Sequence, residues 1–323
     1  MIANTQIPLV SFIVTTYNLP IEYIKECLES IIQLSLNPKE REIILIDDGS
    51  DICPLNDLAE YLPNIIYLRQ PNQGVSVARN YGIKIATGKY IQFIDGDDYI
   101  LQATYEHCLD IVRYHQPDIV TFNYCKNNKN IEPSYELPTP VTGTDFLNNN
   151  NLHCAAWSYI FRHSIVGSLQ FTPKIVYGED EEFTPQLFLR AERIFKTNTE
   201  AYFYRDNKNS VSHQYTKEKI QLRMDNSLEV LLHLQQLLDK LPIAERQALS
   251  RRIAQLSMDY LYNNIRLHHS LISLNQAINN LREHGLYPLP DKKYTKKYTM
   301  FRRAINTLSL IHISEPTRHS LIS

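Results

Sequence analysis

The chain has 323 residues, 43% of them hydrophobic, which is long enough for one large domain or two smaller ones. Its formal net charge of −2 does not suggest a nucleic-acid-binding protein. The five cysteines lie far apart and form no CxxC pair, so we expect neither a disulfide framework nor a zinc site, and a reducing cytoplasm fits best.

The first apolar run of the chain is typical of a strand and not of a signal peptide. No basic segment precedes this run, which soon reaches Asn18 and Pro20. No apolar stretch is long enough to span a bilayer. We therefore expect any membrane contact to be peripheral.

The residues up to 125 alternate between strand-like and helix-like segments. Four apolar runs are typical of buried strands: 8–18, 43–46, 65–68 and 90–94. The helix-like segments between and after them are 21–34, 54–61, 74–86 and 101–115. This alternation predicts an α/β fold with a doubly wound, mostly parallel sheet. Neither G-x-G-x-x-G nor G-x-x-x-x-G-K-[ST] occurs, which removes the usual support for dinucleotide-binding and P-loop proteins.

Acidic side chains follow two of the predicted strands. Asp47 and Asp48 come after the second strand, and Asp95, Asp97 and Asp98 come after the fourth. Ligands of open α/β sheets bind at the carboxyl ends of the strands, so we expect these acids at one edge. Crowded carboxylates repel one another unless a divalent cation takes up their charge. The second group therefore predicts a Mg²⁺ or Mn²⁺ site with positions left open for the phosphate oxygens of a donor.

Two other interpretations of the segment 95–98 remain. Asp and Gly favour turns for local backbone reasons, so the segment can be a simple turn. A calcium-binding loop fits poorly, because Tyr99 occupies a ligand position and Ile100 replaces the glycine that such a loop needs. Thr15 and Thr16, which end the first strand, also suit a strand sterically. Their occurrence together with both acidic groups, in this order, favours a shared site.

Four segments resemble successive motifs of family 2 glycosyltransferases, which have the GT-A fold: 15–18, 46–50, 72–80 and 93–98. The resemblance is strongest from residue 8 to about residue 124. It implies a nucleoside-diphosphate sugar, UDP-linked, as the donor, and Mn²⁺ or Mg²⁺ as the cofactor. It also implies that donor and metal contacts come from Thr15, Tyr17, Asp47, Asp48, Arg79, Asp95 and Asp97, and Asp98 could replace Asp97 as the direct metal ligand.

The resemblance continues into an acceptor-binding half around Trp157 and the pair Glu179-Asp180. Asp180 matches the second acid of the family's Glu-Asp pair, which implies that it is the general base, with Glu179 beside it. One base opposite a metal-held leaving group implies in-line attack and inversion at the anomeric carbon. The residues alone leave alternatives, because acids also suit the start of a helix and Trp157 can be core as well as a platform for the acceptor sugar.

Residues 204–213 correspond to a loop that closes over the diphosphate in this family. Arg205 or His213 could contact the phosphate or the metal there, although a solvated Arg and a surface His are the ordinary interpretations. The stretch 159–162 departs from the Lys-Leu-Tyr-Arg that is usual in the family, so the acceptor pocket is expected to differ in detail.

We divide the chain into a nucleotide-sugar-binding half at 1–125, an acceptor-binding half of the same GT-A domain at 126–215, a C-terminal helical region at 216–307, and 308–323. Basic and aromatic residues interleave within 291–303, which is typical of peripheral membrane contact, with a solvated tail as the alternative. The last part resembles the conceptual translation of a sequencing adapter and is interpreted as an artefact.

These expectations describe an inverting, metal-dependent glycosyltransferase of the hexosyltransferase type. The resemblance implies a saccharide or lipid-linked acceptor and a role in bacterial surface-polysaccharide assembly, in the cytoplasm at the inner face of the cell membrane. A non-catalytic nucleotide- or glycan-binding subunit is one alternative, and the retention of Asp97 and Asp180 argues against it. A sugar-phosphate nucleotidyltransferase is another, and the Gly-rich, basic N-terminal signature of that class is absent.

Overall fold

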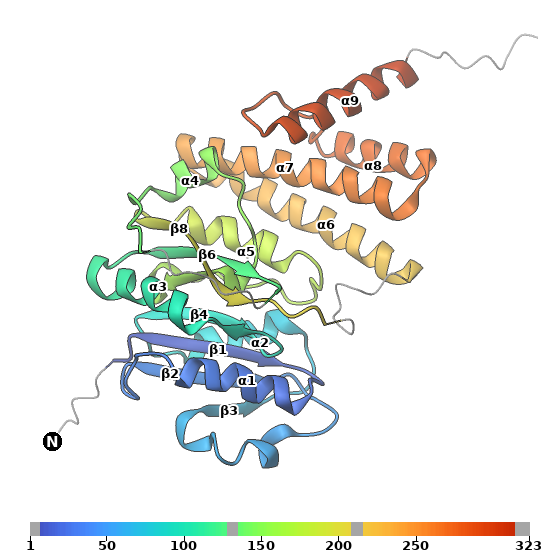
Figure 1. The fold of residues 1–323 in the computed structure, drawn as a ribbon. Helices are drawn as coiled ribbons and strands as arrows, with labels where there is room; N and C mark the ends of the chain where they lie inside the picture. Colours follow the sequence, from blue (N-terminus) through green and yellow to red (C-terminus); the bar gives the residue numbers. More distant parts are fainter. Residues whose placement is uncertain (1–6, 128–134, 208–215, 314–323) are drawn as a thin grey trace, which may run out of the picture. The chain divides into compact units, whose positions relative to one another are not determined.

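The computed structural model describes residues 7–127, 135–207 and 216–313, with side chains described as far as residue 307 (Figure 1). The chain divides into two compact units, Met1–Tyr215 and Thr216–Ser323. The first unit contains the sheet that carries the predicted acids. The second unit is helical in the part that the structure describes.

One sheet of eight strands, in the order β3-β2-β1-β4-β7-β6-β8-β5, organises the first unit. The strands are β1 (Val10–Thr16), β2 (Arg41–Asp47), β3 (Ile66–Arg69), β4 (Tyr90–Asp95), β5 (Tyr99–Ile100), β6 (Ile119–Cys125), β7 (Tyr159–Arg162) and β8 (Ile194–Phe203). β1 pairs in parallel with β2 and β4, and β2 with β3. β7 is antiparallel to both β4 and β6, and β6 is parallel to β8. The carboxyl ends of β1, β2, β3, β4, β6 and β8 therefore face the same edge.

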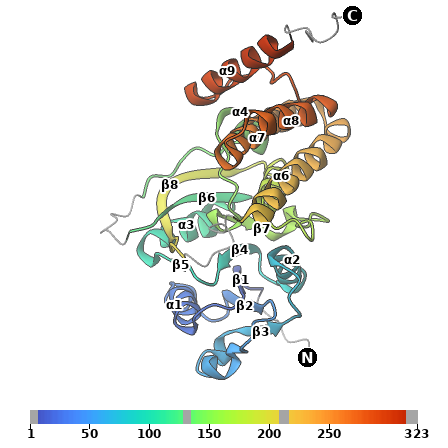
Figure 2. The same ribbon diagram turned by 90° about the vertical axis from the view of Figure 1, so that its right-hand side faces the viewer.

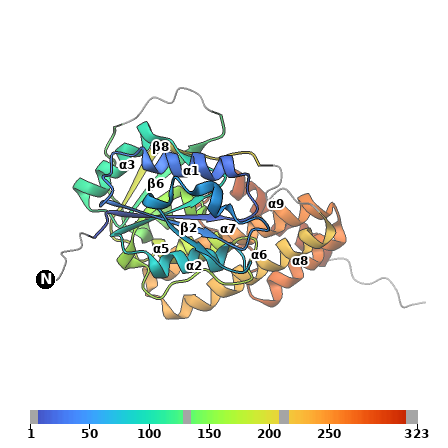
Figure 3. The ribbon, with the colours of Figure 1, turned by 90° about the horizontal axis from the view of Figure 1, so that it is seen from below.

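Helices cover both faces of this sheet. The helices of the first unit are α1 (Ile21–Ile32), α2 (Val75–Ile85), α3 (Gln102–His115), α4 (Gly143–Asn149) and α5 (Glu179–Phe188). Figure 3 shows α1 and α3 on one face and α2 and α5 on the other. This mostly parallel, doubly covered sheet confirms the predicted α/β class.

Burial explains why these elements form where the sequence predicts them. All seven residues of β1 are buried, as expected for a parallel strand that is covered on both faces. α1 buries Ile24, Leu28 and Ile31 at helical spacing, which turns one apolar side toward the sheet. α2 approaches β1 closely at Gly82, where an added Cβ would lie 2.3 Å from the side chain of Ile13.

The described residues between 135 and 151 include the short helix α4. It begins where Thr142 Oγ1 accepts a hydrogen bond from the backbone N–H of Asp145. β5, β6, β7 and β8 were not among the predicted strands. β8 alternates buried and exposed positions over only part of its length, and the four residues of β7 are too few to show a period.

The second unit contains α6 (Lys217–Leu237), α7 (Ile243–His268), α8 (Leu271–Glu283) and α9 (Lys296–Ile313) (Figure 2). α7 packs against α6 and α8 and buries apolar residues such as Leu249 and Leu261. None of the described helices has the length and apolar character needed to cross a membrane. Residues 308–313 form the end of α9, and the rest of the proposed adapter segment lies outside the described residues.

Candidate functional site

The sheet register brings the predicted site residues of three strands to one edge. Thr16 at the end of β1 is opposite Asp47 of β2, and Thr15 is opposite Asp95 of β4. Thr15, Thr16 and Asp47 are buried, whereas Asp95 is half-buried. The acids that lie 48 residues apart in the sequence thus flank the same strand.

Arg79 on α2 connects this edge to the start of α5. Its Nη1 lies 2.8 Å from Asp180 Oδ1 and 3.0 Å from Glu179 Oε1, and its Nη2 lies 3.1 Å from Asp95 Oδ1. The residue is 3% exposed, and its guanidinium lies over the ring of Phe171 at 5.4 Å. We call Arg79, Asp95, Glu179 and Asp180 the Arg79 cluster. Three carboxylates and one guanidinium make this cluster formally negative.

Asp180 is held in place from two sides. Arg79 contacts its Oδ1, and the backbone N–H of Ala156 donates a 3.0 Å hydrogen bond to its Oδ2. Burial raises the pKa of Asp180, whereas the charge of Arg79 lowers it. Burial and the neighbouring Asp180 raise the pKa of Glu179 to about 8. A fixed carboxylate with a raised pKa is a suitable proton acceptor, because general bases work best when their pKa approaches the working pH.

Asp95, Asp97 and Asp98 differ in how their oxygens are used. Asp98 is buried, and its oxygens accept hydrogen bonds from the backbone N–H of Arg205 at 2.7 Å and from Tyr202 Oη at 2.9 Å. Asp97 Oδ2 accepts a 2.9 Å hydrogen bond from Asn207. Asp98 is therefore part of the framework, whereas Asp95 and Asp97 retain more capacity to bind a cation.

The charges of this turn are crowded. Burial and the carboxylate of Asp95 raise the pKa of Asp97, and the same two causes raise the pKa of Asp98 to about 8. A divalent cation would relieve such crowding, and its preferred ligands are hard carboxylate oxygens, so the donor set fits Mg²⁺ or Mn²⁺. The described residues hold no group of three or more His, Cys, Asp or Glu side chains arranged for a metal. His213 lies outside the described residues.

Asp47 is satisfied by protein partners. Its Oδ1 accepts a 2.9 Å hydrogen bond from the backbone N–H of Ser50, and its Oδ2 lies 3.1 Å from both Tyr67 Oη and Arg69 Nε. Sequence reasoning missed Tyr67 and Arg69. Both lie on β3, next to the strand that ends at Asp47, and Tyr67 falls within the strand predicted at 65–68, so this adjacency was the available signal.

Asp48 shapes the loop that leads into α2. Its Oδ1 accepts hydrogen bonds from Gln70 Nε2 at 2.7 Å and from the backbone N–H of Gln73 at 3.0 Å, and its Oδ2 accepts one from Gly74 at 2.8 Å. These contacts make Asp48 a loop-organising residue. Tyr17, in contrast, is 46% exposed, so its ring remains available to a ligand at the edge.

Trp157 is 6% exposed, and its ring stacks on Tyr202 with the centroids 4.4 Å apart. Of the two interpretations of Trp157, this burial favours the core residue. Arg205 also points into the protein: its Nε donates a 2.7 Å hydrogen bond to the carbonyl of Asp97, its Nη2 pairs with Glu26, and its guanidinium lies 4.2 Å from the ring centroid of Tyr23. Arg205 thus stabilises the turn of Asp97 through its backbone carbonyl.

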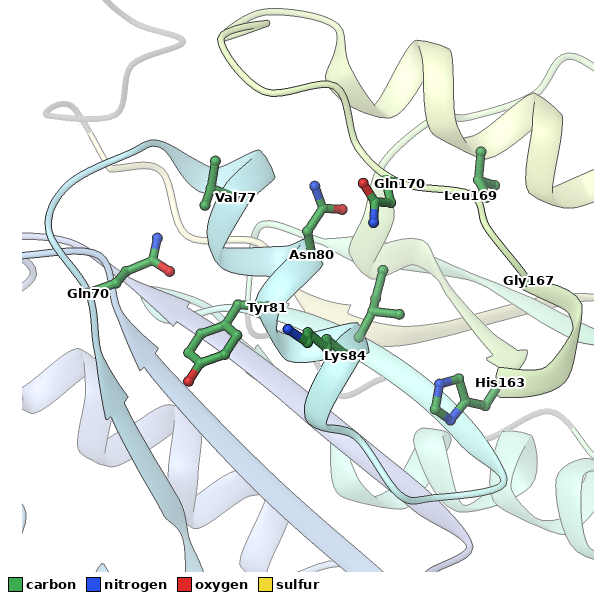
Figure 4. A pocket seen from close by; sticks show the side chains of 10 residues that line it. Gln70, Val77, Asn80, Tyr81, Lys84, His163, Gly167, Leu169 and Gln170 are labelled. Carbon is green, nitrogen blue, oxygen red and sulfur yellow. The ribbon is translucent and has the colours of Figure 1, made fainter.

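A groove of about 640 Å³ runs along α2 and the segment 163–170 (Figure 4). Its lining includes Gln70, Tyr81, Lys84 and His163 but none of the acids described above. The groove and the acidic edge are therefore separate features of the first unit.

The chain is similar in sequence to known glycosyltransferases. EpsJ of Bacillus subtilis strain 168, an uncharacterized glycosyltransferase, is 32% identical over 64% of this chain and 63% of its own length. Glycosyltransferase GlyA of Streptococcus pneumoniae is 26% identical over 77% of this chain and 38% of its own length. The chain thus spans less than two thirds of the length of these relatives.

Solved structures support the same fold. The crystal structure of Staphylococcus aureus TarS 1-349 in complex with UDP-GlcNAc superposes with a TM-score of 0.71, at 20% identity, over 98% of this chain and 95% of that one. The mannosyltransferase PcManGT of Pyrobaculum calidifontis in complex with GDP-Man and Mn²⁺ gives 0.55, at 15% identity, over 95% and 88%. The model of the family named Glycosyl transferase family 2 matches residues 11–168. Residues 11–168 of this chain therefore form a glycosyl transferase family 2 domain.

Proposed function

We propose that this protein is an inverting, metal-dependent glycosyltransferase that uses a UDP-linked sugar and acts in bacterial surface-polysaccharide assembly. The relatives support the class: TarS is named a poly(ribitol-phosphate) beta-N-acetylglucosaminyltransferase, and its structure contains UDP-GlcNAc. The acceptor of this chain would be a saccharide or a lipid-linked saccharide. The single observation that carries the proposal is the Arg79 cluster, which joins a carboxylate of the donor edge to the candidate base.

Asp180 accepts the proton of the acceptor hydroxyl in this proposal. The acceptor oxygen forms a bond to the anomeric carbon while the bond from that carbon to the diphosphate breaks, and the diphosphate leaves with the electron pair. One displacement inverts the anomeric carbon. Each carboxylate oxygen has two lone pairs, so Asp180 can receive this proton although Arg79 and Ala156 already contact it.

Asp95 and Asp97 would hold Mn²⁺ or Mg²⁺. The bound cation supplies positive charge to the leaving diphosphate. Asp98 and Arg205 keep the turn of Asp97 in shape through the contacts described above. Glu179 contributes by fixing Arg79, to which it is 3.0 Å away, so that the guanidinium stays aligned with Asp180.

Tyr17 would contact the nucleotide base, because it is exposed at the carboxyl end of β1. Asp47 would act in the same region. Asp47 is buried and contacts both Tyr67 and Arg69, so its role would be to hold these two side chains in position for contact with the base. Arg69 is the charged member of this pair and would favour an electron-rich carbonyl edge of the base.

We also propose a peripheral membrane contact through 291–303, which depends on the basic residues of this segment and not on its aromatic residues. Tyr298 donates a hydrogen bond to Asp259 at 2.8 Å, and Phe301 contacts Tyr262, so these aromatic side chains pack against α7. Within 296–307, the part of α9 whose side chains are described, the exposed residues are instead Lys296, Lys297, Met300, Arg303, Ala304 and Thr307. Such a contact would be mainly electrostatic. Replacing Lys296, Lys297 and Arg303 by Glu should abolish flotation with anionic liposomes, and unchanged flotation would contradict the proposal.

A screen of nucleotide sugars tests the proposed function. UDP-, GDP- and dTDP-linked hexoses would be incubated with the protein, with and without Mn²⁺, and hydrolysis and binding would be measured. We expect turnover of a UDP-sugar that requires the metal. Metal-independent turnover, or binding without any turnover for the whole panel in the presence of saccharide acceptors, would contradict the proposal.

A further inference from the structure

A cluster of aromatic rings lies at the same sheet edge as the acids, on the other side of β4 from the nucleotide strands. β6 and β8 run parallel to each other and end at this edge, with Tyr124 near the end of β6 and Tyr202 and Tyr204 at and just after the end of β8. Trp157 comes from the short turn before β7. Along this edge of the sheet, Tyr17 follows β1, the acidic turn follows β4, and the aromatic rings lie at the ends of β6 and β8.

The cluster has a buried part and an accessible part. Trp157 and Tyr202 are stacked and buried. Tyr124 and His153 cover Trp157 at centroid distances of 5.2 and 5.7 Å, and Tyr204 does so at 5.8 Å. Tyr124 is 36% exposed, His153 is exposed and Tyr204 is half-buried. We call Tyr124, His153 and Tyr204 the aromatic surface, for which Trp157 and Tyr202 are the support.

Short contacts link this support to both halves of the proposed reaction site. Ala156, the neighbour of Trp157 in the sequence, donates the hydrogen bond that holds Asp180. Tyr202 donates to Asp98 Oδ2 at 2.9 Å, and the backbone N–H of Asp95 donates to Tyr202 Oη at 3.1 Å. The support is therefore adjacent in the chain to the backbone group that holds the candidate base, and its Tyr202 side chain contacts the acidic turn.

The rings of the aromatic surface hold one another in fixed positions. Tyr124 lies 5.6 Å from His153 and 5.8 Å from Tyr204, measured between ring centroids. Lys126 Nζ lies 5.0 Å from the centre of the Tyr204 ring. Rings that are fixed before binding lose little conformational entropy when a ligand packs against them. Their apolar faces with polar edges suit a sugar ring, which also has C–H faces and hydroxyl edges.

We propose that Tyr124, His153 and Tyr204 bind the sugar ring of the acceptor, while Trp157 supports them from below. This proposal rests on the proposed function. It assigns the acceptor contact to rings from β6, the segment before β7 and the end of β8. Ala156, which precedes Trp157 in the chain, contacts Asp180, so the support of this surface is one residue away from a contact of the candidate base.

Steady-state kinetics of Tyr124→Ala and Tyr204→Ala test the assignment. The acceptor panel consists of methyl glycosides of glucose, galactose and N-acetylglucosamine, which carry no aromatic group of their own. We expect the KM for the acceptor to rise about five- to twentyfold, as loss of one ring contact predicts, with the donor KM changed less than twofold. Tyr124→Phe keeps the ring and should keep the acceptor KM within twofold of the wild type.

Tyr114→Ala is the matched control, because Tyr114 on α3 is 76% exposed and outside the cluster. It should leave both KM values unchanged. Acceptor KM values within twofold of the wild type in both Tyr→Ala variants would overturn the assignment while the proposed function stands. A wild type that turns over no nucleotide sugar would instead overturn the proposed function. The thermal unfolding of each variant shows whether a loss of acceptor binding comes from a loss of folding. A Tyr124→Ala protein that has the melting temperature of the wild type and an unchanged acceptor KM also overturns the assignment.

Discussion

Two acidic strand ends of this protein look alike in the sequence and differ in the structure. Asp47 and Asp48 after β2 have their oxygens occupied by backbone N–H groups, Tyr67, Arg69 and Gln70. Asp95 and Asp97 after β4 lie in a turn where burial and like charge raise the pKa of Asp97. The first pair builds structure, and the second keeps an excess of negative charge. Arg79 neutralises part of this charge, and the excess that remains is the feature that suits a cationic cofactor.

The largest expected effect is on catalysis at the second pair. Asp97→Asn removes a charge from the candidate metal site, so kcat/KM should fall about a hundredfold or more, as it does when one charge-stabilising group is lost. The same change relieves repulsion with Asp95, so the melting temperature should stay the same or rise. Assays over a Mn²⁺ titration and calorimetry measure both. A large loss of stability would mean that Asp97 is structural, like Asp48.

Arg79→Lys should have the next largest effect. A lysine ammonium is a point charge and cannot contact three carboxylates in the planar geometry of a guanidinium. We expect kcat to fall about tenfold to a hundredfold, with a smaller change in donor KM, because Asp180 loses its alignment. Steady-state kinetics with the best donor of the screen would show this. A kcat that stays at the wild-type value, or a donor KM that changes as much as kcat does, would contradict the role of Arg79 in positioning Asp180.

Asp48→Ala tests the first pair through stability. The substitution leaves the donors of Gln70, Gln73 and Gly74 without their acceptor, so the free energy of unfolding should fall by about 3 kcal/mol. Urea titration of the protein measures this change. Asp48→Asn, which keeps one acceptor oxygen, should lose roughly half as much. A stable Asp48→Ala protein that no longer binds donor would show that Asp48 acts on the ligand instead.

A smaller effect is expected in the pH dependence of catalysis, which depends on the pKa of Asp180. Asp180 must be ionised to accept a proton, and burial raises its pKa while Arg79 lowers it. Activity should therefore be lost on acidification at a higher pH than the ordinary aspartate pKa of about 3.9 predicts. Arg79→Gln removes the lowering charge and should move this acidic limb further up. An acidic limb that stays in place in Arg79→Gln would contradict the link between the two residues.

The sequence predicted most of the first 115 residues, because the strands there are continuous apolar runs and the helices have one apolar side. β1, β2, β3, β4, α1 and α2 lie within a few residues of the predicted ranges, whereas the helix predicted at 54–61 is a short 3-10 helix at Pro54–Leu58. The edge position of Asp47 and Asp95 followed from the same alternation. β5, β6, β7 and β8 were not predicted. β8 pairs with β6, about 75 residues earlier in the chain, and no local pattern reports such a pairing.

Side-chain partners that are distant in the sequence account for the rest. Arg79 meets Glu179 and Asp180 about 100 residues later, and no local pattern reports such a contact. Trp157 is covered by Tyr124, Tyr202 and Tyr204, which come from two other strands, so its burial was equally invisible. The positions of Tyr67 and Arg69 next to Asp47 could have been predicted from the order of the strands, but neither residue belongs to a recognisable sequence motif.

The most direct test of the central claim is the transfer activity of Asp180→Asn, measured together with its binding of UDP in the presence of Mn²⁺. Asn has nearly the same shape but does not accept the proton, so transfer should fall about 10²- to 10⁴-fold. UDP binding, measured by calorimetry, should remain within twofold of the wild type. Full transfer activity in Asp180→Asn would show that the base is another group and would contradict the account.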